Sequence, residues 1–213
     1  RELSGAVAHE FRTPLARLKF ALEARPASDS VKWNAMSLDV EELERLVQEM
    51  LDYAGSDVLY PELNLAEIPI KELVEQVVSH LQTPHLANHD ISITGENLLL
   101  LGDDHFVQRA LENLLVNASR YAKSRILINI TQDDDYVVLS VEDDGPGIPK
   151  DVQERIFDAF YRPDEGRTRA YGGAGLGLAI VRRIQQWHEG DCQVQDSMLG
   201  GVKFTLRYPR HDR

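Results

Sequence analysis

A histidine beside a carboxylate stands near the start of the chain, in the stretch AHEFRTPL at residues 8–15. Apolar residues recur every three or four positions around it and predict an amphipathic helix. His9 lies about 200° around that helix from the apolar Val7, so its imidazole is expected to face solvent. Thr13 shares this exposed face, and Pro14 predicts a kink because it lacks a backbone N–H. The pattern indicates a reactive imidazole, whereas a lone exposed histidine is usually only solvated.

A neutral imidazole acts as a nucleophile when a carboxylate fixes its tautomer and takes its proton. Glu10 is placed for that role. A zinc site is the competing interpretation, because His-Glu-x-x-His motifs begin in the same way. Thr13 stands where the second zinc ligand would have to be, which disfavours a zinc hydrolase.

Two asparagines, Asn113 and Asn117, lie four residues apart in the stretch NLLVNASRYA at residues 113–122. They share one face of a predicted helix. The apolar residues of this helix that are expected to face a core are Leu111, Leu114, Leu115 and Ala118. An amide oxygen is a suitable ligand for Mg²⁺, and a neutral side chain does not repel phosphates. A pair of capping or surface asparagines is the plain alternative.

Two glycine-containing stretches follow. EDDGPGI at residues 142–148 comes after a strand-like run and is also compatible with an ordinary turn. GAGLGL at residues 173–178 opens a second helical run. A dinucleotide-binding fingerprint is excluded there because Leu178 occupies the place of its third glycine. A phosphate-binding Walker A loop is excluded because no Gly-Lys-Ser/Thr occurs in the chain.

These motifs and their order resemble two parts of one protein family. The stretch at residues 8–15 resembles the H-box of bacterial sensor histidine kinases. The asparagine helix, EDDGPGI, IFDAFYR at residues 156–162 and GAGLGL resemble the N, G1, F and G2 boxes of the ATPase fold shared by histidine kinases, gyrase, Hsp90 and MutL. The resemblance covers nearly the whole chain.

The resemblance implies a role for each matching residue. His9 would be phosphorylated, with Glu10 as its proton acceptor and Thr13 serving removal of phosphate from a partner. Asn117 would bind Mg²⁺, and Asp143 would accept a hydrogen bond from the adenine amino group, with Asp144 as the obvious substitute. The other residues implied to line the ATP site are Asn113, Arg120, Tyr121, Gly145, Gly147, Phe160, Arg162, Gly173, Gly175, Leu176 and Gly177.

Length and charge agree with this assignment. A chain of 213 residues predicts two domains. Its net charge of −12 disfavours a general affinity for nucleic acid. Its single cysteine, Cys192, excludes an internal disulfide and is expected to be a small buried residue. No apolar run reaches the ~20 residues that span a bilayer, so no membrane contact is expected for this cytoplasmic stretch. Arg1 already lies in a predicted helix, and the resemblance implies sensing and transmembrane segments upstream, in the bacterial inner membrane.

The helical part is expected to form a dimer. A turn at residues 25–30 separates two helices, and the second carries a heptad stripe of apolar residues. The stripe consists of Met36, Val40, Leu43, Val47, Met50 and Ala54. Because one hairpin cannot form a stable core, two copies are expected to associate into a four-helix bundle. Residues 1–57 are therefore predicted to be a dimerisation and phosphoacceptor domain.

Residues 58–213 are predicted to be an α/β sandwich that binds ATP, so that the whole fold is α plus α/β. Its elements outside the glycine motifs are a helix at 71–81, the asparagine helix, and strands at 91–93, 97–101, 126–131, 136–141 and 201–208. The acidic run at 133–135 is predicted to be a hairpin tip.

Two departures from the family pattern are Phe11 for the usual leucine and Glu189 for a glycine in a His-Gly-Gly turn.

The resemblance implies a sensor histidine kinase core. It would autophosphorylate His9 from ATP and transfer the phosphoryl group to an aspartate in the receiver domain of a response regulator, which it would also dephosphorylate. One alternative is a degenerate, nucleotide-binding dimeric scaffold or phosphatase; loss of His9, Asn117 or Asp143 would have supported it. Another, a stand-alone ATPase, is disfavoured because Asn113 stands where such enzymes carry a water-activating glutamate.

Overall fold

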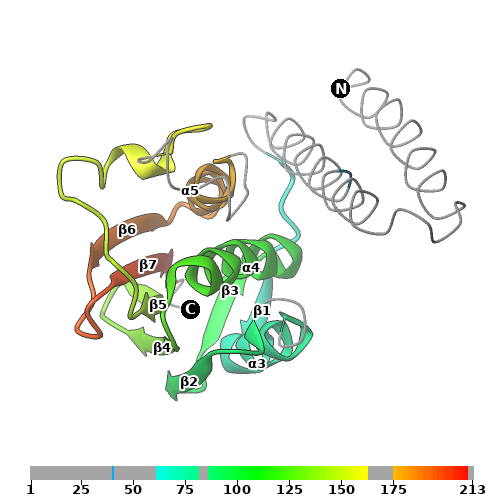
Figure 1. Cartoon of the computed structure of the whole chain (residues 1–213). Coiled ribbons are helices and arrows are strands. Elements are labelled where there is room, and N and C mark those ends of the chain that lie inside the picture. The colour runs from blue at the N-terminus through cyan, green and yellow to red at the C-terminus, as the bar shows by residue number, and fades with distance from the viewer. Residues whose placement is uncertain (1–39, 41–60, 82–85, 163–174, 211–213) are drawn as a thin grey trace, which may run out of the picture. The chain divides into compact units, whose positions relative to one another are not determined.

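The computed structural model describes Val40 and residues 61–81, 86–162 and 175–210 (Figure 1). The chain divides into two units, one of residues 1–59 and 164–176 and the other of residues 60–163 and 177–213. Within the first unit Val40 is helical and buried, as the heptad stripe predicts. The predictions for His9, Glu10, Thr13, Gly173 and the dimer of hairpins lie outside the described residues.

The second unit is built on a five-stranded mixed sheet in the order β2-β4-β5-β7-β6. Its strands are β2 (Asp90–Gly95), β4 (Arg125–Gln132), β5 (Tyr136–Asp143), β6 (Asp191–Asp196) and β7 (Val202–Pro209). β2 runs parallel to β4, and the other neighbours are antiparallel. A separate antiparallel pair consists of β1 (Ala66–Pro69) and β3 (Leu99–Gly102).

Alternating burial shows that this sheet has one packed face. In β4 every second residue from Ile126 to Ile130 is buried, and in β7 the same holds from Val202 to Tyr208. Such alternation is typical of an antiparallel sheet with one face on the core and the other in water. The helices α3 (Ile70–Leu81), α4 (Asp104–Tyr121) and α5 (Gly177–Trp187) lie on the packed side (Figure 1).

The predicted apolar face of the asparagine helix is confirmed, because Leu111, Leu114, Leu115 and Ala118 are all buried in α4. A short 3-10 helix, η3 (Arg155–Phe157), contributes Phe157, whose ring meets Phe204 edge-on with 6.2 Å between centroids. Within the described residues, no helix is long and apolar enough to cross a membrane.

The structure differs from the sequence prediction mainly at the sheet edges. β6 was not predicted, because its sequence DCQVQD lacks a clear apolar alternation and an edge strand is only half covered. Cys192 in this strand is half-buried, not buried as expected, and burial raises the pKa of its thiol to about 12. β5 continues to Asp143, two residues further than predicted. The hairpin tip is confirmed: the Asp133 carboxylate accepts from the backbone N–H groups of Asp135 and Tyr136.

Candidate nucleotide-binding site

One line of side chains on α4 carries the asparagine motif. The helix begins at its N-cap Asp103, whose carboxylate accepts from the N–H of Phe106 (3.4 Å), and ends before Ala122. Asn113, Asn117 and Tyr121 follow one another at intervals of four residues, so they form a stripe about 12 Å long on one side of the helix. The two asparagines are half-buried and Tyr121 is exposed, which leaves this stripe accessible to a ligand.

The start of α5 lies against the first asparagine. Nδ2 of Asn113 donates to the carbonyl of Arg109 (2.9 Å), so its Oδ1 is turned outward. A Cβ atom added to Gly177 would stand 2.9 Å from this Oδ1, so a larger residue there would displace the Asn113 side chain. The structure therefore places Gly177 of the G2 motif against Asn113 of the N motif. The amide of Asn117 has no hydrogen-bond partner among the described residues, and its oxygen is available to a cation.

Asp143, the last residue of β5, is a buried carboxylate that is only half satisfied by the protein. Its Oδ1 accepts from the backbone N–H groups of Gly145 (2.8 Å) and Val202 (3.4 Å). Within the part of the chain that the structure describes, no donor bonds Oδ2. Burial raises the pKa of Asp143; the two backbone bonds oppose this effect, and the charge of Asp144 adds to it. Because Oδ1 is held by backbone bonds and Oδ2 has no partner among the described residues, Oδ2 can accept a hydrogen bond from an amino group such as that of adenine.

Asp144, the substitute expected from the sequence, has its carboxylate bonded within the protein. Its Oδ1 accepts from the backbone N–H groups of residues 123, 124 and 125 at 2.8–3.1 Å, and its Oδ2 accepts from the hydroxyl of Ser124 (2.9 Å). Burial alone would raise the pKa of Asp144, but these donors hold it well below its ordinary value. The side chain thus anchors the end of β5 to the segment after α4, and its acceptors are occupied.

Glycines allow the backbone to close around Asp143. A Cβ atom on Gly145 would stand 2.5 Å from the carbonyl oxygen of Tyr121, so the G1 turn lies directly against the end of α4. Gly147 has φ of +75°, a conformation that glycine adopts without strain. Gly201, just before β7, was not predicted to be a site residue, yet a Cβ atom there would collide with Asp143. The only signal for it in the sequence is the pair Gly200-Gly201 in front of a strand.

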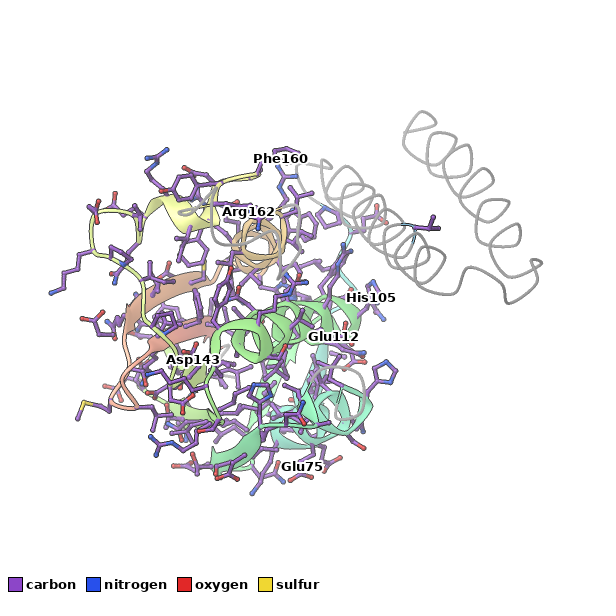
Figure 2. All side chains as sticks on the ribbon, in the orientation of Figure 1. Glu75, His105, Glu112, Asp143, Phe160 and Arg162 are labelled. Atoms are coloured by element: carbon purple, nitrogen blue, oxygen red, sulfur yellow. The ribbon has the colours of Figure 1, made fainter. Side chains whose placement is uncertain are left out.

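The predicted F-box residues are not brought to this carboxylate. Figure 2 shows Phe160 and Arg162 well away from Asp143. An ion pair from Asp158 to Arg182 (3.6 Å) ties their segment to α5 instead. Phe160 is 60% exposed and has φ of 65°, which is uncommon for an aromatic residue. The roles expected for Phe160, Arg162 and Arg120 therefore stay predictions.

The remaining glycine-motif residues precede α5. Gly175 has φ of +73° and Leu176 is buried. Both belong to the first of the two units, and their predicted part in nucleotide binding stays a prediction.

Two family models match the chain. Residues 102–212, just over half of it, match "Histidine kinase-, DNA gyrase B-, and HSP90-like ATPase", and residues 1–57 match "His Kinase A (phospho-acceptor) domain".

Similar proteins are sensor kinases of bacteria. Sensor protein RstB of Escherichia coli (strain K12) is 36% identical over 213 residues, which are 98% of this chain and 48% of that protein. Sensor histidine kinase CpxA of the same strain is 31% identical over 224 residues, covering 100% of this chain and 48% of that protein. The chain thus spans about half the length of these relatives.

A solved structure has the same fold. It is the crystal structure of full-length ShkA in complex with AMPPNP, with a TM-score of 0.80 and 32% identity, covering 98% of this chain and 45% of that one. Taken with the matched models and the arrangement of Asn113, Gly177 and Asp143, these similarities show that the chain belongs to the sensor histidine kinases of bacterial two-component systems.

Proposed function

We propose that this chain is the catalytic core that phosphorylates its own His9 from ATP and passes the phosphoryl group to an aspartate of a response regulator. The observation that carries the proposal is the half-satisfied, buried carboxylate of Asp143, which lies beside the end of the asparagine helix. The whole protein would be about twice as long and carry its sensing and membrane segments outside this stretch, in the bacterial inner membrane.

The ATP site would run along the stripe on α4. Oδ2 of Asp143 would accept from the adenine amino group, with Tyr121 bordering the base. The phosphates would lie toward Asn113, Asn117 and the N-terminus of α5, where free backbone N–H groups favour anions. The donor set fits Mg²⁺, since the amide oxygen of Asn117 is not used by described residues. A bound Mg²⁺ would neutralise phosphate charge during transfer.

The reaction itself would take place on His9. One ring nitrogen attacks the γ-phosphorus, the bond from phosphorus to the bridging oxygen breaks, and ADP leaves with that electron pair. Glu10 takes the proton from the other ring nitrogen. The phosphoryl group then moves from His9 to the receiver aspartate, and a homodimer of helical hairpins provides the docking surface for that partner. The chemistry requires positioning and charge neutralisation, and the residues named above supply both.

Following the γ-phosphate of labelled ATP tests this proposal. The label should enter the protein in an acid-labile, base-stable form, and His9→Gln should abolish incorporation. His80→Gln, which changes an exposed histidine on α3, is the matched control and should incorporate normally. Label that appears only as free phosphate would indicate a stand-alone ATPase, and label that stays in ATP would indicate a degenerate scaffold. Full incorporation by the His9 variant would end the assignment.

Thr13 is proposed to orient the water that removes phosphate from the partner, because it is expected to lie one helical turn after His9. Thr13→Ala should keep autophosphorylation and lose dephosphorylation of the purified, phosphorylated partner. Equal dephosphorylation by the variant and the wild type would leave Thr13 with a structural role only.

A further inference from the structure

A buried histidine at the far end of α5 connects the two helices that form the nucleotide site. His188 follows α5 directly. Its Nδ1 bonds the carbonyl of Ile184 within the same helix (2.8 Å), and its Nε2 accepts from the backbone N–H of Asp103 (3.0 Å). A carbonyl can only accept and an N–H can only donate. Both bonds therefore require a neutral imidazole with its proton on Nδ1.

Asp103 is itself a junction of three segments. Its carboxylate caps α4 through the N–H of Phe106 and also accepts from the N–H of Asn64 (2.9 Å), in the segment that leads into β1. Trp187 packs edge-on against Phe106 with 5.0 Å between ring centroids. The C-terminal end of α5 is thus attached to the N-terminal end of α4 by one directional bond and one aromatic contact.

The opposite end of α5 is the one that meets the asparagine motif. Gly177 stands against Asn113, whereas Trp187 stands against Phe106, so the two helices run antiparallel and both ends of α5 contact α4. A helix rises about 1.5 Å per residue. Sliding α5 by one residue along α4 would displace the acceptor by about 1.5 Å, half the length of this 3.0 Å bond, and would weaken it or break it. The bond to Asp103 therefore sets where Gly177 stands relative to Asn113.

We propose that His188 is a positioning residue for nucleotide binding: through Asp103 it holds α5 against α4 and keeps the N-terminus of α5 beside Asn113. The inference rests on the proposed function in one respect, namely that ATP binds along this stripe. His188 lies at the other end of α5 and does not line the proposed ATP site.

The surroundings of the ring make this bond sensitive to pH. Burial lowers the pKa of His188, while the bond to Ile184 and the charge of Asp103 oppose that effect. Among the described residues, the other titratable group packed on the ring is Tyr208 in β7, which burial keeps neutral by raising its pKa. Glu189, the residue after His188, is exposed. The neutral ring is the form that the folded state favours. Its contribution to the free energy of unfolding is complete above about pH 6.5, the ordinary pKa of histidine, and is lost as the pH falls from there through the lowered pKa of the folded state.

Two substitutions separate the cross-helix bond from the rest of the site. In His188→Asn the amide nitrogen takes the place of Nδ1 and can still donate to Ile184, but it cannot reach Asp103. In His188→Gln the amide oxygen takes the place of Nε2 and can accept from the N–H of Asp103. ATP affinity of the 213-residue chain, measured by calorimetry at pH 7.5, should fall about tenfold in the Asn variant and stay within about threefold of wild type in the Gln variant.

The pH profile gives a readout that a purely structural role would not change. As the pH falls from 7.5 through the lowered pKa of His188, the wild type should lose more ATP affinity than His188→Gln, which has no group to protonate at this position; titration of ATP itself affects both equally. Circular dichroism and thermal unfolding establish that each variant is folded. If the Asn variant does not fold, the comparison of the Gln variant with wild type decides.

The outcomes separate this inference from the proposed function. If wild type does not bind ATP, the proposed function fails. If wild type binds ATP, equal affinities in both variants, or parallel pH profiles of wild type and His188→Gln, overturn the positioning role of His188.

Discussion

At the N-terminal end of α4, Asp103 and His188 find all their hydrogen-bond partners inside the protein, whereas at the middle of the same helix Asn113 has its Oδ1 beside Gly177 at the start of α5. No described residue bonds the amide of Asn117. Buried polar groups are normally paired, so groups that the protein leaves unpaired mark a place for a ligand. The hydrogen bonds at one end of the α4–α5 pair are thus made within the protein, and the other end is where we propose that the nucleotide binds.

The same contrast separates two neighbouring carboxylates at the end of β5. Asp144 has both oxygens bonded, with donors that lower its pKa, whereas Asp143 has one oxygen available and a raised pKa. We call a position closed when its polar atoms are bonded within the protein, and open when one of them is left without a partner among the described residues. Substitutions at closed positions should therefore reduce stability, and substitutions at open positions should reduce ligand binding.

The largest effect is expected at an open position of α4. Asn117→Asp should reduce Mg²⁺-dependent autophosphorylation roughly 100-fold while leaving thermal unfolding nearly unchanged, because a second negative charge beside the phosphates repels them. Asn129→Asp, on the solvated face of β4, introduces the same charge away from the site and is the control. A normal rate in the Asn117 variant would show that this residue does not bind the metal.

Asp143→Asn should weaken ATP binding about 10- to 100-fold, because the amide presents a donor where an acceptor is required. Its stability should not fall, since the amide oxygen can keep both backbone bonds and the raised pKa shows that burial disfavours the charge. Calorimetry with ATP and thermal unfolding measure the two quantities. An unchanged affinity would move the adenine contact away from Asp143.

Asp144→Asn should show the reverse pattern. The free energy of unfolding in urea should fall by about 1–2 kcal/mol, because charge-assisted bonds become neutral ones, and ATP affinity should be kept. The folded-state pKa of Asp144 is lowered, so wild type should lose this stabilisation as the pH falls below about 4, and the variant should not. Lower ATP affinity without lower stability would contradict the distinction between the two carboxylates.

The smallest effect is expected at Glu189, which has φ of 54° although it is not a glycine. Glu189→Gly should raise the free energy of unfolding by about 0.5–1 kcal/mol, because glycine adopts this conformation without strain. Gln186→Gly, one turn earlier at an exposed position in α5, should instead lower it by a similar amount. Equal signs for both variants would show that the backbone conformation at Glu189 is not the cause.

Local features of this fold could be predicted from the sequence, and contacts between distant residues could not. The period of apolar residues predicted α4 with its buried leucines, and the glycine motif predicted the start of α5. The bond between Asp103 and His188 joins residues 85 positions apart, and no local pattern indicates it. The contact of Gly201 with Asp143 was missed for the same reason, since Asp143 is far away in the sequence, at the end of β5. The acceptors of Asp144 are occupied by three successive backbone donors, which composition cannot reveal.

Amide hydrogen exchange of the 213-residue chain with and without AMPPNP and Mg²⁺ tests most directly whether only one end of the helix pair receives the nucleotide. We expect slower exchange on binding at Gly177 and Leu178, and no change at Asp103 and Phe106, whose N–H groups are already bonded within the protein. Protection at Asp103 and Phe106 without protection at Gly177 and Leu178 would contradict this.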